Sequence, residues 1–232
     1  MRLCLLLVLI GTAVQAQPRL VARASLGLDQ HGDVGGLGEW QDSERLQISA
    51  RGIEASVTDD FPAYGSIEGA LGVDLGSIEL GILAGTSSTG GRLAYADYSG
   101  SLVVERIARR TFFGLYGEGL PVEAGPVRLG AGLAARLSRT TVRYQRDLIV
   151  GDLKVETADI EMTGSPVSVE PMFLGEATVV GPIHARVRTG WELSSTSELN
   201  VGDLPPDARQ ASPTVGWSGL RASIGLAIRV GQ

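Results

Sequence analysis

The chain has 232 residues and a formal net charge of −6, with only 5% aromatic residues and 32 glycines. This length accommodates one β domain or two small domains. The mildly acidic charge, without a basic patch, argues against a protein that binds nucleic acid. After the first ten residues, no apolar run reaches the roughly eighteen residues that a transmembrane helix requires. The abundant glycine favours a chain built from strands and tight turns.

The first sixteen residues have the features of a secretory signal peptide. A short apolar run follows Arg2, and Val14-Gln15-Ala16 matches a cleavage site of small residues. We therefore expect residues 1–16 to be a signal peptide that is removed on secretion. The only cysteine, Cys4, lies in this segment, so we expect the mature chain to have no disulfide, thiolate metal site or cysteine nucleophile.

Beyond residue 17, apolar and polar residues alternate over eight segments, as in β-strands whose two faces have different surroundings. The predicted strands are Arg19–Asp29, Ser66–Leu75, Ile78–Gly85, the two halves of Phe113–Leu137, the two halves of Val167–Trp191, and Leu220–Val230. No segment shows a helical period.

Three short turns, around Gly76, Gly125 and Gly181, alternate with four long connections. The long connections are residues 30–65, 86–109, 139–166 and a polar segment that contains Pro205-Pro206. Parts of these connections alternate weakly, and we interpret them either as loops or as extensions of the neighbouring strands beyond a barrel. Strict alternation predicts an all-β fold, an eight-stranded antiparallel up-and-down transmembrane β-barrel with the short turns and both termini at one end.

The polar face of the predicted strands carries many charges of both signs, and every positive one is an arginine. We expect these side chains to form an ionic network in the lumen, because the arginine fork can donate to several carboxylates at once. Glycines and alanines on the same face are expected to make room for them. The predicted network consists of Arg23, Glu68, Asp74, Glu79, Glu118, Arg128, Arg136, Glu170, Glu176, Arg186, Arg188, Glu192, Arg221 and Arg229.

The opposite face of the predicted strands is aliphatic and almost free of charge. A charge that faces lipid at the midplane of a bilayer costs about 2–4 kcal/mol, so a membrane would enforce this exclusion. A soluble barrel of the lipocalin kind would instead line its interior with apolar residues. We therefore expect Leu129→Arg or Leu133→Arg to block membrane insertion, and Arg136→Ala to be milder.

The last predicted strand resembles the carboxy-terminal assembly signal of bacterial outer-membrane barrels. Ser223, Gly225, Ile228 and Val230 take its polar, glycine and two hydrophobic positions, although aliphatic residues replace the usual aromatic and Gly231-Gln232 follow. The mature chain thus resembles small barrels of the OmpA-transmembrane or OmpX type, without a motif that ties it to one member. The resemblance implies that residues 17–232 form a barrel in the bacterial outer membrane. It also implies contacts with outer-membrane lipid, the barrel-assembly machinery and extracellular ligands that would reach the long loops.

Candidates for catalysis are few. His31 and His184 are the only histidines. His31 lies in a Gly/Asp-rich segment with Asp29 and Asp33, and His184 lies next to a short turn beside Arg186, so neither shows the closely spaced His and Ser with a supporting acid that a lipid A deacylase would need. Asp59-Asp60 resembles the paired aspartates of omptin-like proteases but lacks the Asp-His pair that completes such a site. We expect a non-enzymatic structural or surface-interaction role, with a plugged lumen and no cofactor or metal. The alternatives are a narrow porin-like channel for small solutes and a soluble periplasmic lipocalin-like binding barrel.

Overall fold

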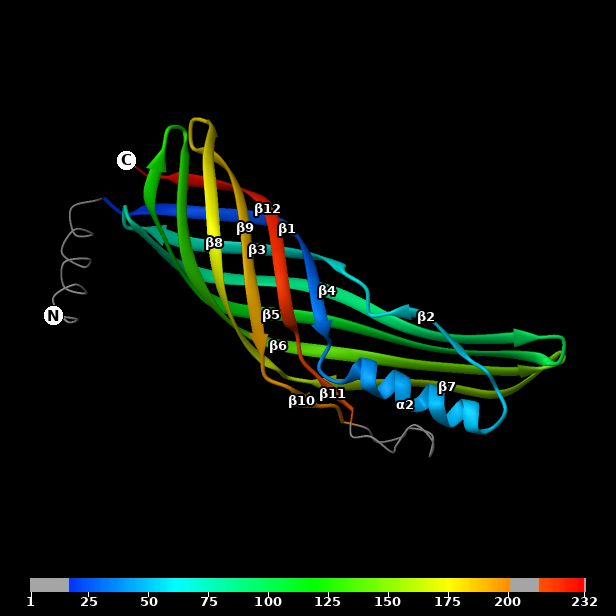
Figure 1. Ribbon diagram of the computed structural model, residues 1–232. Coiled ribbons are helices and arrows are strands. Elements are labelled where there is room, and N and C mark those ends of the chain that lie inside the picture. Colours follow the sequence, from blue (N-terminus) through cyan, green and yellow to red (C-terminus); the bar gives the residue numbers. More distant parts are fainter. Residues whose placement is uncertain (1–16, 201–212, 232) are drawn as a thin grey trace.

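The computed structural model describes residues 17–200 and 213–231 (Figure 1). The predicted signal peptide and part of the segment that contains Pro205-Pro206 lie outside the described residues. The elements are β1 (Arg19–Asp33), α2 (Leu37–Ala50), β2 (Ser56–Asp60), β3 (Tyr64–Asp74), β4 (Ile78–Asp97), β5 (Gly100–Ala124), β6 (Val127–Val150), β7 (Leu153–Gly164), β8 (Val167–Val180), β9 (Ile183–Ser194), β10 (Ser197–Glu198), β11 (Thr214–Val215) and β12 (Ser218–Val230).

Antiparallel pairing continues around a ring of about eight strands, in the order β1, β3, β4, β5, β6, β8, β9 and β12, and β12 pairs with β1. This arrangement confirms the prediction of an all-β fold with an antiparallel ring. The strand count differs from the prediction, because β2 and β7 also join the sheet by pairing with β4 and β6 outside the ring. The ring is not closed evenly, since β6 pairs with β8 along one half of its length and with β7 along the other.

The short turns lie together at one end of the ring. Their glycines, Gly76, Gly125 and Gly181, have φ values of 94°, 64° and 52°, a region that glycine adopts without steric cost. The start of β1 and the end of β12 reach the same end, where Arg19 pairs with Asp74 and Leu20 with Val230. The predicted placement of the short turns is therefore observed.

The prediction that residues 86–109 and 139–166 form long loops is wrong, because most of these residues lie in strands. β4 and β5 continue as one hairpin to a turn at Asp97–Gly100, and β6 and β7 continue to a turn between Val150 and Leu153. We call these outer parts of β4 to β7, residues 88–110 and 138–164, the extension. Figure 1 shows that it projects far beyond the other strands of the ring. Residues in the extension still alternate with a period of two, but here the inward residues are mostly apolar and the outward ones polar, the reverse of the ring. In the sequence, this reversal hides the fact that the same strands continue.

The helix α2 also contradicts the prediction, which placed residues 30–65 in a long loop without helix. Its buried face consists of Leu37, Trp40, Gln41, Glu44 and Ile48, which recur at helical spacing. Gln41 and Glu44 interrupt the apolar stripe, so the hydrophobic period is weak in the sequence. The helix packs against the inner face of the extension, in a cluster that includes Leu93, Leu102, Val104, Val142, Tyr144 and Trp217.

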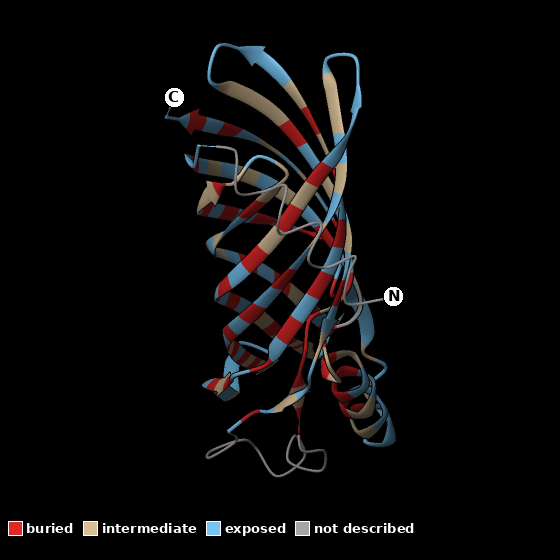
Figure 2. Cartoon of the chain, turned by 90° about the vertical axis from the view of Figure 1, so that its left-hand side faces the viewer, coloured by how far each residue is buried: buried red, intermediate tan, exposed pale blue. Residues whose placement is uncertain are grey.

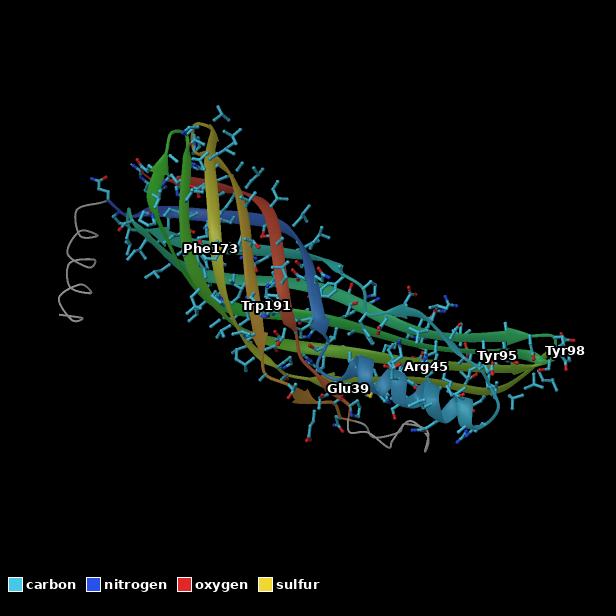
Figure 3. The ribbon with its side chains drawn as sticks, in the orientation of Figure 1. Glu39, Arg45, Tyr95, Tyr98, Phe173 and Trp191 are labelled. Carbon is cyan, nitrogen blue, oxygen red and sulfur yellow. The ribbon has the colours of Figure 1, made fainter. Side chains whose placement is uncertain are left out.

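Buried and exposed residues alternate along the strands in bands (Figure 2). In the ring, the exposed residues are largely apolar, including Leu26 (62% exposed), Leu133 (55%) and Phe173 (72%). Figure 3 shows Phe173 and Trp191 on the outside of the ring. Among the described residues, no helix has the length and apolar character needed to cross a membrane.

Candidate functional site

The predicted network residues all point into the ring, and most of them are buried. Arg128, at the end with the short turns, is the most exposed, with 28% of its side chain accessible. The others, together with Asp29 and Arg110, form two layers along the barrel axis. We call them the turn-side layer (Arg23, Asp74, Glu79, Glu118, Glu176, Arg186 and Arg229) and the middle layer (Asp29, Glu68, Arg110, Arg136, Glu170, Arg188, Glu192 and Arg221).

Arg229 is the centre of one half of the turn-side layer. It donates to Asp74 at 3.1 Å and to Glu79 at 3.1 Å, and it also binds Glu176. In the other half, Glu118 accepts a hydrogen bond from Arg23 at 2.6 Å and one from Arg186. Each arginine thus meets at least one carboxylate, so the charges in this layer are compensated locally.

In the middle layer, two carboxylates are shared between several arginines. Glu68 accepts hydrogen bonds from Arg188 at 2.6 Å and from Arg136 at 3.3 Å. Glu170 lies 2.5 Å from Arg136 and 3.5 Å from Arg221, and Arg221 also donates to Asp29 at 3.0 Å. The layer is one connected cluster in which the removal of one member leaves several partners uncompensated.

These ion pairs cross the interior of the ring. Glu68 on β3 meets Arg136 on β6 and Arg188 on β9, and each of these strands lies three places from β3 in the ring. Arg229 on β12 likewise meets Glu79 on β4. Strands so far apart can touch only through side chains that traverse the lumen, so the network fills the barrel rather than lining its wall.

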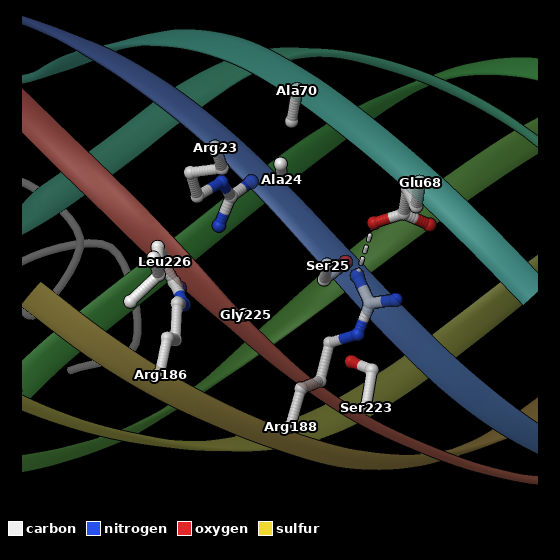
Figure 4. A pocket seen from close by; sticks show the side chains of 10 residues that line it. All are labelled: Arg23, Ala24, Ser25, Glu68, Ala70, Arg186, Arg188, Ser223, Gly225 and Leu226. Carbon is white, nitrogen blue, oxygen red and sulfur yellow. Dashed lines mark hydrogen bonds and ion pairs between the residues drawn. The ribbon is translucent and has the colours of Figure 1, made fainter.

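A small cavity separates the two layers (Figure 4). Arg23, Arg186, Arg188 and Glu68 contribute to its walls, and its volume is about 20 Å³. A space of this size holds about one water molecule.

Small residues on the inner face make room for the long side chains, as the sequence predicts. A Cβ atom on Gly81 would lie 2.6 Å from the Tyr116 hydroxyl oxygen and 2.2 Å from the Leu71 carbonyl oxygen. The Tyr116 hydroxyl donates to Glu79 at 2.9 Å, and the Arg23 guanidinium lies 3.9 Å from the centre of the Tyr116 ring. Gly81 thus allows Tyr116 to join the turn-side layer.

The sequence prediction missed Arg110, which is fully buried and lies 3.0 Å from Glu192. Its guanidinium also stacks on Trp217 and Phe112, with 5.1 Å and 4.7 Å to the ring centroids. Arg110 falls on the same alternation as Tyr116 and Glu118, and extending the β5 pattern towards the N-terminus would have found it. The prediction began this strand at Phe113.

A second buried ionic cluster links α2 to the extension, beyond the middle layer. Glu44 pairs with Arg106, lies 3.9 Å from Arg146 and accepts a hydrogen bond from the Tyr144 hydroxyl at 2.7 Å. The Arg106 guanidinium lies 4.5 Å from the centroid of Trp40, on the same helix as Glu44. Burial lowers the pKa of Arg106 to about 10, so the guanidinium remains charged at neutral pH. The helix is thus fixed over the inner face of the extension, and we call this cluster the cap.

Glu44→Gln is expected to loosen α2, because Arg106 would keep its charge in a buried site without a carboxylate. Breaking one partner of a buried pair costs about 3–5 kcal/mol. Hydrogen exchange of the α2 amides should therefore become faster in the variant. The control is Asp42→Asn on the same helix, whose ion pair with Arg45 is exposed and should change stability by less than about 1 kcal/mol. Equal protection of α2 in both variants would contradict this role of Glu44.

The outer turn of the β4–β5 hairpin is held by Asp97. Its carboxylate accepts hydrogen bonds from the Tyr95 hydroxyl at 2.6 Å and from the Ser99 backbone and hydroxyl at 2.7 Å. These bonds, led by that from Tyr95, lower the pKa of Asp97 to about 2. Tyr98 beside it is fully exposed (Figure 3).

The residues weighed for catalysis do not come together. His31 pairs with Gly219 at the far end of β1, whereas His184 lies near the short turns, 3.6 Å from Glu176 and 3.2 Å from the Thr178 hydroxyl. Asp59-Asp60 are exposed on β2. Within residues 17–200 and 213–231, no group of three or more His, Cys, Asp and Glu side chains is arranged to hold a metal ion.

The four residues of the predicted assembly signal lie along β12, where Ser223 and Gly225 face the lumen and Ile228 and Val230 face outwards. Gly225 pairs with Ser25 on β1 and Arg186 on β9. Recognition of this four-residue signal by the barrel-assembly machinery stays a prediction.

The outer surface changes character along single strands. On β6, the ring half exposes Leu129, Leu133 and Leu137, whereas the extension exposes Arg139 and Arg143. The inner face changes in the opposite sense, from charged residues in the ring to Val142, Tyr144, Leu102 and Val104 in the extension. On β5 the outer surface changes between Phe113 and Thr111, which pair with Leu137 and Arg139 on β6, so the boundary lies at the same level on both strands.

No family model matches the chain, and no curated protein matches it. Among solved structures, the outer membrane protease OmpT from Escherichia coli is similar with a TM-score of 0.41 and 11% identity, covering 92% of this chain and 95% of that one. CarO of Acinetobacter baumannii is similar with a TM-score of 0.34 and 12% identity, covering 90% of this chain and 96% of that one. These are resemblances between chains of low identity, and they assign no function to this one.

Proposed function

We propose that the chain is a bacterial outer-membrane β-barrel with a plugged ionic lumen and a structural or surface-interaction role. The ring would lie in the membrane, the short turns in the periplasm, and the extension with α2 outside the cell. Outer-membrane lipid and the barrel-assembly machinery would be its partners during insertion. Residues 1–16 would direct secretion.

The reversal of polarity along β5 and β6 carries this proposal. A strand surrounded by water on its outer face has no reason to expose leucine over one half and arginine over the other. A bilayer that ends at this boundary supplies the reason, because lipid contacts the ring and water contacts the extension. The outward residues of the ring strands include no charged side chain between Leu20 and Leu28 on β1, or between Leu220 and Val230 on β12. Each stretch is about as long as a tilted strand that spans the hydrocarbon core, for which about 9–11 residues are needed.

Cell fractionation tests the location. The protein should sediment with outer membranes, require detergent for extraction, and migrate differently on a gel before and after boiling. Recovery in the soluble periplasm without detergent would contradict the proposal and favour the lipocalin-like alternative. The lumen itself speaks against that alternative, because in the described part of the ring buried arginines and carboxylates stand where a lipocalin-like barrel would have an apolar lining.

The packing of the lumen favours a plug over the porin-like alternative. Two layers of ion pairs cross the interior, and the cap, with α2, lies beyond them on the side of the extension. An eight-stranded barrel has an interior that side chains just fill. Purified protein in a planar bilayer should therefore give no single-channel steps in KCl. Regular, reproducible conductance steps from the folded barrel would support the channel instead.

The extension is the part that we propose for surface interactions. Apolar residues are exposed at its tip, where Val150 pairs with Leu153 and the Asp97–Gly100 turn lies beside them. Tyr98, Leu153 and Val155 are 100%, 74% and 61% exposed. Exposed apolar side chains that gather in one place are typical of contact surfaces. The residues weighed for catalysis, His31, His184 and Asp59-Asp60, lie on separate parts of the barrel, and we propose a non-enzymatic role.

A further inference from the structure

A row of residues at the boundary of the ring and the extension differs from both. Its outward side chains on β5 and β6 are Arg109, Thr111, Arg139 and Thr141, and the outward neighbour of Arg109 on β4 is Ser88. Below the row, the surface is aliphatic. Above it, Arg92 and Arg143 are paired with carboxylates. The row combines hydroxyl groups with two arginines and contains no carboxylate.

A groove opens on the outer surface at this row. β6 pairs with β8 up to Leu137 and Val167, and with β7 from Thr140 and Gly164 onwards. Between these pairings the chain passes through Ser165-Pro166, and the Ser138 amide donates to the Pro166 carbonyl oxygen at 3.0 Å. The change of partner leaves a depression of about 550 Å³. Its apolar lower wall is formed by Phe113, Leu137 and Val167, and Arg139, Thr111 and Ser165 line the polar side.

The arginines of this row are uncompensated, unlike those of the extension. Arg143 pairs with Asp159 at 2.5 Å and Arg92 with Glu105 at 3.3 Å. Arg109 and Arg139 are exposed, and neither forms an ion pair with any residue whose position the structure describes. Arg109 lies opposite Thr141, two residues from Arg139, so the two are diagonal neighbours. Their Cβ atoms are thus about 7–8 Å apart, within reach of one common anion.

We propose that this groove binds a membrane lipid with a phosphate-bearing anionic headgroup. The phosphate would accept hydrogen bonds from Arg139 and Arg109, since the guanidinium fork matches phosphate oxygens. Thr111 and Ser165 can donate further bonds to the headgroup, and an acyl chain would lie along Phe113, Leu137 and Val167. The inference rests on the proposed membrane location, because it places the groove at the level of the lipid headgroups. Charge complementarity and the continuity of the groove with the aliphatic surface identify the occupant as a lipid.

Native mass spectrometry of the folded protein, released from neutral detergent, tests the proposal. The probes are phosphatidylglycerol, phosphatidylcholine with the same acyl chains, and inorganic phosphate. The wild type should retain phosphatidylglycerol about tenfold more tightly than phosphatidylcholine, from two arginine contacts. Arg109→Gln with Arg139→Gln should abolish this preference. The control Arg143→Gln lies on the same face of β6 but in an ion pair, and it should keep the preference.

A wild type without headgroup preference, or a double variant that keeps it, would overturn the proposal. Inorganic phosphate that competes as well as the lipid would overturn it in favour of a free anion. Insertion of the wild type into vesicles of phosphatidylcholine alone reports separately on the membrane location, because it does not depend on an anionic headgroup. If insertion succeeds and the preference is absent, only the lipid site is wrong.

Discussion

Leu133→Arg is expected to abolish assembly of the barrel in the outer membrane. Leu133 lies on the outer face of β6, is 55% exposed, and pairs in register with Gly117 on β5 and Pro171 on β8, neither of which is charged. Arginine at this depth would meet hydrocarbon, at a cost of about 2–4 kcal/mol. The measurement is the amount of heat-modifiable protein in outer membranes, which should fall to background.

The matched control is Thr141→Arg, on the same face of the same strand but in the extension. Thr141 pairs with Arg109 on one side and Thr163 on the other. At the level of the headgroups, where arginine costs only about 0–1 kcal/mol, a further arginine should leave assembly at the wild-type level. Equal amounts of folded protein from the two variants would contradict a hydrocarbon boundary between them.

Glu68→Gln is expected to cause a large loss of stability. Glu68 contacts Arg136, Arg188 and Arg221, at 3.3, 2.6 and 3.9 Å. Glutamine has nearly the same volume, so the variant removes the charge without creating a cavity. Loss of a buried partner costs about 3–5 kcal/mol, which should lower the urea midpoint of the inserted barrel, followed by tryptophan fluorescence.

Glu105→Gln provides the control for Glu68→Gln. Its carboxylate pairs with Arg92 on the outside of the extension, where both side chains are more than one third exposed. Such exposed pairs contribute less than about 1 kcal/mol, and solvent screens them further. The urea midpoint of Glu105→Gln should stay close to that of the wild type. A Glu68→Gln midpoint that also stays there would show that the layer does not stabilise the barrel.

The middle layer also changes the expectation for Arg136→Ala. From the sequence, this substitution should be milder than an arginine in the lipid-facing surface. In the structure, Arg136 is almost completely buried between Glu68 and Glu170. Its removal would leave two carboxylates close together without it, so we now expect a destabilisation of about 3–5 kcal/mol. The size of the destabilisation therefore does not distinguish a lumen position from a position on the outer face. A pair of variants on the same face of one strand, such as Leu133→Arg and Thr141→Arg, distinguishes them better.

The ring was predictable because its period-two pattern has one constant polarity. Alternation from Arg19 to Asp29 and from Leu220 to Val230 identifies strands and assigns their faces without knowledge of their neighbours. Glycine at 76, 125 and 181 marks the turns by local conformation alone. The inward arginines follow from the same pattern, but their partners do not. Some carboxylates come from the neighbouring strand, as Glu170 does for Arg136, and others from three places away in the ring, as Glu68 does.

The extension and α2 were not predictable in the same way. In the extension, charged and polar residues replace aliphatic ones on the outer face, and apolar residues that pack against α2 replace most of the charges on the inner face. The polarity therefore reverses at about Thr111 on β5. The helix depends on Glu44, whose burial is possible only because Arg106 and Tyr144 approach from strands that are distant in the sequence. A glutamate in an apolar stripe indicates a surface position until its partners are known.

The most direct test of a lipid-facing ring is quenching of a fluorophore by brominated acyl chains. Residues 17–232 contain no cysteine, so Leu133→Cys and Thr141→Cys each supply one labelling site on the same face of β6. In vesicles that contain the folded protein, brominated lipid should quench the label at position 133 strongly and the label at position 141 weakly. Equal quenching at the two positions, or full access of position 133 to a water-soluble quencher, would contradict the account.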